Sequence, residues 1–187
     1  MNYSEIIQAL DMVWEDKPRL DILACREEAY NLLDPALQDL SEFTWNSLQE
    51  QLIDNVAELG DEDIADIEEA VTDSVGFGVD IYLSCILAST GRLVSTGHKS
   101  VQTDEVLKVI EKPELQVTIM ERFELVPLIL RDFAQERLEA LIAQISGLAE
   151  LPWELVDSLR QSILALATTT FLISAVHLEN SYPAQAE

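Results

Sequence analysis

The sequence predicts an all-α protein, a compact single-domain bundle of about six to eight helices. Apolar residues recur at three- and four-residue spacings along most of the chain, which is the period of an amphipathic helix. The 187 residues fit one domain with a substantial core, and the 48% apolar content argues against disorder despite a net charge of −24. We therefore expect one helical domain over residues 1–179, followed by a flexible tail over 180–187.

Start and stop signals predict two helices in the first part of the chain. Ser4 is expected to cap the first helix, which ends near residues 16–18. Pro18 suits the first turn of a helix, so a second one is expected over 19–33. The pair Asp34-Pro35 is expected to end it, because proline interrupts a helix interior.

A third helix follows. Residues 36–40 are expected to form a short helical turn, and Ser41 is expected to cap the helix that reaches Leu59. Gly60 would then supply the left-handed C-terminal residue.

The fourth helix begins at Asp61 and has two distinct faces. At about 100° per residue, one face is an apolar stripe that we expect to be buried, formed by Ile64, Ile67, Val71 and Val75. The opposite face is a row of carboxylates, which we call the acidic row: Glu62, Asp66, Glu69 and Asp73. Like charges at these spacings cost about 0.2 to 0.5 kcal/mol per pair, so the acidic row is mildly destabilising.

Glycines follow the acidic row. Gly76-Phe77-Gly78 predicts either a kink or a break between two helices, and an apolar helical face resumes from Val79 to Gly91. Residues 92–102 are rich in Ser, Thr and Gly and predict a loop, after which Thr103 is expected to cap a short helix that ends at Lys112.

The last part of the chain predicts two long helices. Pro113 is expected to open a helix that runs to Ile145 and is kinked at Pro127, and the segment 151–153 is expected to start the final helix. Residues 161–178 carry no charge and reach the length of a membrane span, but seven of them are Gln, Ser, Thr or His. We favour a central helix buried on most sides over a membrane span.

The negative charge is concentrated in the middle of the sequence. The stretch 27–91 contains sixteen Asp or Glu residues and no Lys or Arg, so it carries −16 of the net charge. An acidic surface repels nucleic acid and anionic membranes, and it favours a basic partner. We therefore expect a protein that binds neither nucleic acid nor a membrane directly. The alternative to a basic partner is that the acidic residues only keep the protein soluble.

No pattern of residues predicts a reaction. His98 and His177 complete no HExxH or Glu-x-x-His arrangement, and the acidic cluster at 61–63 lacks the glycine and the ligand spacing of an EF-hand loop. The glycine pair at 76–78 lacks the rest of a phosphate-binding motif, and there is no nucleophile elbow. Pairs of carboxylates at helical spacing are so common in this sequence that none of them indicates a catalytic acid and base. We expect a protein that is not an enzyme and uses no cofactor or metal.

The cysteines and the N-terminus predict a cytoplasmic protein. Cys25 and Cys85 lie sixty residues apart without a CxxC spacing, which favours reduced thiols in the core. The first residues lack the basic and apolar regions of a secretory signal.

Two hypotheses about function remain. In the first, the protein binds and neutralises or inhibits a basic protein, as immunity proteins against nuclease toxins and nucleic-acid mimics do; the analogy is physical only. The residues expected to bind the partner are Asp54, Glu58, Glu62, Asp66, Glu69 and Asp73. In the second, it is a structural or adaptor subunit that binds through apolar surface, with the tryptophans as anchors unless they are packed in the core: Trp14, Trp45 and Trp153. A homodimer is compatible with either.

Overall fold

The computed structural model describes residues 2–15, 17, 19–53, 59–93, 108 and 111–179. These residues contain six α-helices, one short 3₁₀ helix and no strand. The elements are α1 (Tyr3–Trp14), α2 (Leu20–Ile53), α3 (Asp61–Thr90), α5 (Pro113–Arg122), α6 (Val126–Gln144), η1 (Ser146–Glu150) and α7 (Trp153–His177). The predicted all-α fold is confirmed. Most of the predicted helix over 103–112, most of the loop over 92–102 and the tail over 180–187 lie outside the described residues.

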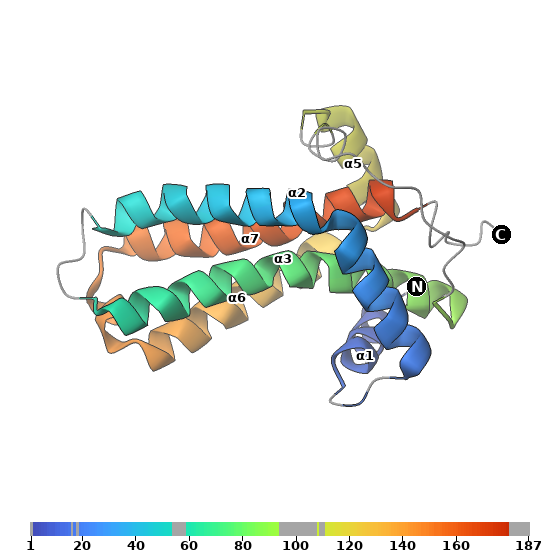
Figure 1. Cartoon of the computed structure of the whole chain (residues 1–187), viewed down its shortest axis with the longest axis horizontal. Coiled ribbons are helices and arrows are strands. Elements are labelled where there is room, and N and C mark those ends of the chain that lie inside the picture. Colours follow the sequence, from blue (N-terminus) through green and yellow to red (C-terminus); the bar gives the residue numbers. More distant parts are fainter. Residues whose placement is uncertain are drawn as a thin grey trace.

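Helix α3 is the centre of the bundle, because α1, α2, α6 and α7 all pack against it (Figure 1). The backbone of α3 lies close to that of α7 at Gly78. A Cβ atom at this position would lie 2.5 Å from the backbone oxygen of Ala167 and 2.8 Å from the backbone nitrogen of Phe171. Glycine therefore allows the two helix backbones to come together. The buried side chains of all these helices form one continuous core.

Of the two alternatives predicted at the glycines of α3, a kink or a break, the structure excludes the break. The helix is continuous through Gly76, Phe77 and Gly78, and its direction changes near its middle (Figure 1). The expected apolar stripe is buried at Ile67, Val71 and Val75, with Ile64 partly buried against the core. Helix α3 ends at Gly91, which has the left-handed φ of 71°.

Helix α2 is continuous, so the predicted break at Asp34-Pro35 and the predicted cap at Ser41 are wrong. Pro35 lies inside the helix, and Figure 1 shows that the axis of α2 bends. An interior proline costs about 3 kcal/mol because it removes a hydrogen bond and clashes with the preceding turn. Leu33, Ala36 and Leu37 on either side of it are all buried, and this burial keeps the helix intact across the proline.

Two predicted helix caps are also wrong. The N-cap of α1 is Asn2, not Ser4: Asn2 Oδ1 accepts from the backbone N–H of Glu5 at 3.0 Å, and Glu5 accepts from the backbone N–H of Asn2 at 2.8 Å. Gly60 is the N-cap of α3 with an extended backbone at φ −75°, so it is not a left-handed C-terminal residue.

The segment that begins at Pro113 forms two helices instead of one long kinked helix. Helix α5 ends at Arg122, and α6 begins at Val126, so that Pro127 lies in its first turn. The turn between them buries Phe123 against Phe171 and Tyr82, with ring centroids 5.4 and 6.2 Å apart. The change of direction predicted near Pro127 is therefore a break that places an aromatic ring in the core.

Two helices of the described residues are long and apolar enough to cross a membrane, α3 and α7. In the folded protein, 83% of the most apolar window of α3 and 56% of that of α7 are buried. Their apolar character is thus accounted for largely by packing inside the bundle. Length and apolar composition alone do not distinguish a core helix from a membrane span.

Candidate binding groove

A groove lies on one side of α3, between α2 and α6. Its volume is about 1020 Å³, and Trp14 at the end of α1 also lines it. The lining residues of α3 extend from Glu68 to Asp80, which is about 18 Å along a helix. The groove is lined by aromatic and apolar side chains, by carboxylates, by two arginines and by a few uncharged polar groups.

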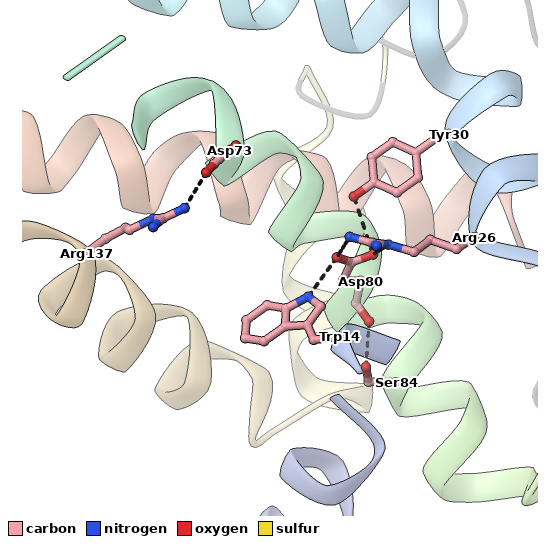
Figure 2. Close-up of polar contacts among 7 residues, drawn as sticks. All are labelled: Trp14, Arg26, Tyr30, Asp73, Asp80, Ser84 and Arg137. Carbon is pink, nitrogen blue, oxygen red and sulfur yellow. Dashed lines mark hydrogen bonds and ion pairs between the residues drawn. The ribbon is translucent and has the colours of Figure 1, made fainter. Parts of the chain in front are cut away.

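Asp80 is the last residue of α3 that lines the groove, and Figure 2 shows its carboxylate among the side chains that bind it. Asp80 is 1% exposed. Arg26 binds it with two hydrogen bonds, from Nε at 2.8 Å and from Nη2 at 2.7 Å. Trp14 Nε1 donates to it at 2.9 Å, and the Tyr30 hydroxyl donates at 3.4 Å. One buried anion therefore joins α1 and α2 to α3.

Asp80 differs from the other buried polar residues in the described part of the chain. Ser74, Ser84, Thr170 and Ser174 each donate to the backbone carbonyl four residues earlier, within their own helix. Asp80 cannot bond to a backbone carbonyl in this way, because a carboxylate accepts hydrogen bonds and does not donate them. Its donors come from two other helices, so this residue couples their positions.

Burial raises the pKa of the Asp80 carboxyl above its ordinary value of 3.8, although hydrogen bonds from Arg26, Trp14 and Tyr30 act in the opposite direction. Burial lowers the pKa of Arg26, but the hydrogen bonds and charge of Asp80 outweigh it and the pKa is raised. Burial also raises the pKa of the Tyr30 hydroxyl. Arg26 and Tyr30 thus remain hydrogen-bond donors at neutral pH.

Three aromatic rings are packed together beside this cluster. Phe77 stacks on Phe133 with ring centroids 3.7 Å apart and planes 4° apart, and Trp14 lies tilted against Phe77 at 5.5 Å. Trp14 is 46% exposed and Phe133 is partly buried. The buried side chains of Leu37, Trp45 and Val75 also line the groove. The groove therefore has an apolar floor that is open to solvent at the aromatic rings.

Carboxylates outnumber basic groups in the groove by six to two. The acidic residues that line it are Asp34, Glu42, Glu68, Asp73, Asp80 and Glu136. The two basic residues, Arg26 and Arg137, are both paired, with Asp80 and Asp73 respectively. No ion pair to a described basic side chain engages Glu42, Glu68 or Glu136, and all three are exposed. The rim of the groove thus carries unneutralised negative charge on α2, α3 and α6.

The acidic row is divided between exposed and paired residues. Glu62 and Glu69 are exposed. Gln144 donates to Asp66 at 2.7 Å, and Arg137 forms an ion pair with Asp73 (Figure 2), so both of these acids face α6. Asp54 and Glu58, the other two predicted partner-binding residues, lie outside the described residues.

The tryptophans differ in their exposure. Trp45 is packed in the core, 6% exposed, while Trp14 is partly exposed and held by Asp80 and Phe77. Trp153 is 67% exposed at the start of α7. Trp45 is therefore a core residue, whereas Trp153 is exposed enough to contact a partner.

The Asp80 cluster was not foreseen from the sequence, although a signal was present. Asp80 is the only charged residue from Ser74 to Gly91, in a stretch that is otherwise apolar or small. A carboxylate in such a stretch is rarely buried unless it is paired. At 100° per residue it also continues the acidic row, since it lies five helical turns after Glu62. The identity of its partners could not be read from the chain, because Trp14 and Arg26 are 66 and 54 residues away.

The described residues bear on two other kinds of site: a metal site and a reactive cysteine. They contain no group of three or more His, Cys, Asp or Glu side chains arranged to hold a metal ion. The thiols of Cys25 and Cys85 are buried, and burial raises the pKa of Cys85 to about 12, which suppresses its thiolate. No protein-family model, curated protein sequence or solved structure matches the chain. Proposals about function therefore rest on the geometry and charge of the molecule.

Proposed function

We propose that this is a cytoplasmic, non-enzymatic protein that binds a basic protein and neutralises its cationic surface. The observation that carries the proposal is the unneutralised charge on one side of the molecule. Exposed carboxylates of α2, α3 and α6 surround the groove, and both arginines in it are paired within the chain. A partner that complements this surface must bring Lys or Arg side chains.

The exposed members of the acidic row extend the same charge along α3. Glu62 and Glu69 lie on the helical stripe that leads to the groove. Asp66 and Asp73 are less suited to partner contact than we expected, because they are engaged with α6. The proposed contact surface is therefore Glu62, Glu69 and the rim of the groove, in place of the whole acidic row. If the partner uses the same cationic surface to hold nucleic acid, binding would inhibit it.

A charge-reversal pair with a matched control tests the proposal. Glu62→Lys/Glu69→Lys and Glu114→Lys/Glu121→Lys each raise the net charge by four, and all four residues are exposed. The immobilised proteins are incubated with a lysate of the source organism and eluted with a salt gradient. We expect a basic protein to be retained by the wild type and by the α5 control, to be lost from the α3 variant, and to elute as salt rises. Equal retention by both variants, or retention that salt does not weaken, would contradict the proposal.

A second function is favoured by a different observation. Phe43 on α2 and Trp153 on α7 are 74% and 67% exposed, which provides apolar anchors for an adaptor that does not depend on charge. Substitution of both by Ser distinguishes the two functions. The adaptor requires loss of partner retention in this variant, and charge-based binding requires retention to persist.

A further inference from the structure

We infer that the groove between α2 and α6 docks an amphipathic cationic helix of a partner protein. The inference rests on the proposed function and makes it specific, because it names the part of the basic partner that binds and the place where it binds. Four properties of the groove lead to it: its size, its apolar floor, its acidic rim and its lack of a free cation.

The size of the groove suits a helix. Its volume of about 1020 Å³ lies just above the range for small-molecule pockets, about 300–1,000 Å³. The residues that line it extend about 18 Å along α3, the length of a helix of about twelve residues. Because the described chain contains no strand, the groove has no sheet edge to which an extended peptide could add.

The floor calls for an apolar face on the ligand. Trp14 and Phe133, packed on either side of the buried ring of Phe77, present aromatic surface, and the buried Leu37 and Val75 also line the groove. Docked helices place residues of the i, i+3, i+4 and i+7 positions into such a surface. A purely polar cationic segment would leave the aromatic rings in contact with water and would gain nothing from them.

The rim calls for positive charge on both flanks of that face. Asp34 and Glu42 lie on the α2 side, Glu136 lies on the α6 side, and Glu68 lies on α3 between them. All four are exposed. A helix with Lys or Arg on either side of an apolar stripe meets carboxylates on both walls.

The same charges argue against other occupants. A second copy of this chain would bring a further net charge of −24 to an acidic surface. Nucleic acid would bring phosphates to a rim that has no unpaired basic group, since Arg26 and Arg137 are both committed to carboxylates. A cationic helix is the occupant that satisfies the floor and the rim together.

Two synthetic peptides test the docking directly. Both have eighteen residues made of Leu, Ala and Lys; in one, Leu forms a single helical face flanked by Lys, and in the other the same residues are scrambled so that no apolar face exists. Binding of fluorescently labelled peptide to the full chain is measured by anisotropy at physiological salt. We expect the amphipathic peptide to bind at least tenfold more tightly than the scrambled one. Equal affinities, or no binding of either peptide, would overturn the inference.

Two pairs of variants locate the binding site. Thr72→Trp places a large side chain in the groove, and Thr118→Trp places the same side chain on the exposed surface of α5. Glu42→Lys/Glu136→Lys reverses the charge of two carboxylates on the rim of the groove. Glu114→Lys/Glu121→Lys makes the same change of charge on α5. We expect at least a tenfold loss of affinity for the amphipathic peptide with each groove variant and less than a twofold change with each control. Circular dichroism verifies that every variant is folded.

The outcomes separate this inference from the proposed function. If Thr72→Trp and the rim reversal bind the amphipathic peptide as the wild type does, the groove is not the docking site. The proposed function would still stand if Glu62→Lys/Glu69→Lys abolished salt-sensitive capture of a basic protein. If that capture were unaffected while the groove variants lost the peptide, the groove would bind helices but the wider charged surface would play no part.

Discussion

The two halves of α3 both carry carboxylates, but in different surroundings. From Asp61 to Asp73 the helix carries seven carboxylates, and those of the acidic row face solvent or α6. From Ser74 to Leu87 nearly every side chain is buried, and the single carboxylate, Asp80, is enclosed by α1 and α2. Asp80 stands on the same helical stripe as the acidic row. What a carboxylate does on this helix is therefore decided by which neighbours cover it, and the following changes test that difference.

Removal of the buried carboxylate should have the largest effect. Asp80→Ala leaves Arg26 and Trp14 without their acceptor, and loss of one partner of a buried ion pair costs about 3 to 5 kcal/mol. Because the Arg26 side chain is 34% exposed and water can reach it, we expect a value at the low end, about 3 kcal/mol. The measurement is the free energy of unfolding in urea. Asp73→Ala, which removes a half-exposed partner of Arg137, is the matched control and should cost less than about 1 kcal/mol. Equal losses would show that the two halves do not differ.

The close contact of α3 with α7 should be the next most sensitive feature. Gly78→Ala pushes a methyl group against backbone atoms of α7, which cannot move without shifting the helix, so we expect a net loss of about 2 kcal/mol. Gly76→Ala meets only the Tyr30 side chain, with its hydroxyl oxygen at 2.7 Å. The higher helix propensity of alanine, worth about 1 kcal/mol, should offset most of that strain. Thermal unfolding of the two variants gives the comparison, and a Gly78→Ala protein as stable as Gly76→Ala would refute it.

The protonation of Asp80 should make a smaller, pH-dependent contribution. Burial raises the pKa of Asp80 above 3.8 in the folded protein, so the folded state holds the proton more tightly than the unfolded state does. Its stabilising contribution is complete below pH 3.8 and is lost as the pH rises through the folded pKa. The stability advantage of the wild type over Asp80→Asn should therefore shrink as the pH is raised from below 3.8 to neutrality. Urea unfolding of both proteins across that range measures it. An advantage that grows with pH would mean that the hydrogen bonds from Arg26 outweigh burial.

The smallest effect is expected in the exposed half of α3. Glu69 lies three residues after Asp66 and four residues before Asp73, so it repels both. Glu69→Gln removes these repulsions and should stabilise the protein by about 0.5 kcal/mol, with little change in helix propensity. The gain should disappear in 1 M salt, where the screening length falls to about 3 Å. A loss of stability at low salt would indicate that Glu69 has a favourable contact within the chain.

Local sequence patterns predicted the helices well where several signals agreed and poorly where one residue stood alone. The apolar stripe of α3 and the start of α7 after Pro152 were both recovered. Pro35 by itself predicts a helix end, because proline is unfavourable inside a helix, but the buried residues around it override that effect. Gly76 and Gly78 suggested a kink or a break because glycine is permissive. Their role is to admit Tyr30 and the backbone of α7, contacts that depend on distant parts of the chain.

The candidate site was only partly predictable for the same reason. Charge and helical period located the acidic row, but the structure engages Asp66 and Asp73 with Gln144 and Arg137 of a helix about seventy residues away. The groove itself requires three helices to be placed side by side, and no local pattern specifies their spacing. The aromatic floor likewise joins Trp14, Phe77 and Phe133, which are far apart in sequence.

By itself, the sequence determined that this chain is helical, which face of each amphipathic segment is apolar, and that its centre is strongly negative. These properties depend on residue identity and on the 3.6-residue period, both of which are local. The tertiary structure alone decided which carboxylates are buried, paired or exposed, and that a groove with an aromatic floor lies among them. These properties depend on the positions of helices relative to one another, which long-range packing sets.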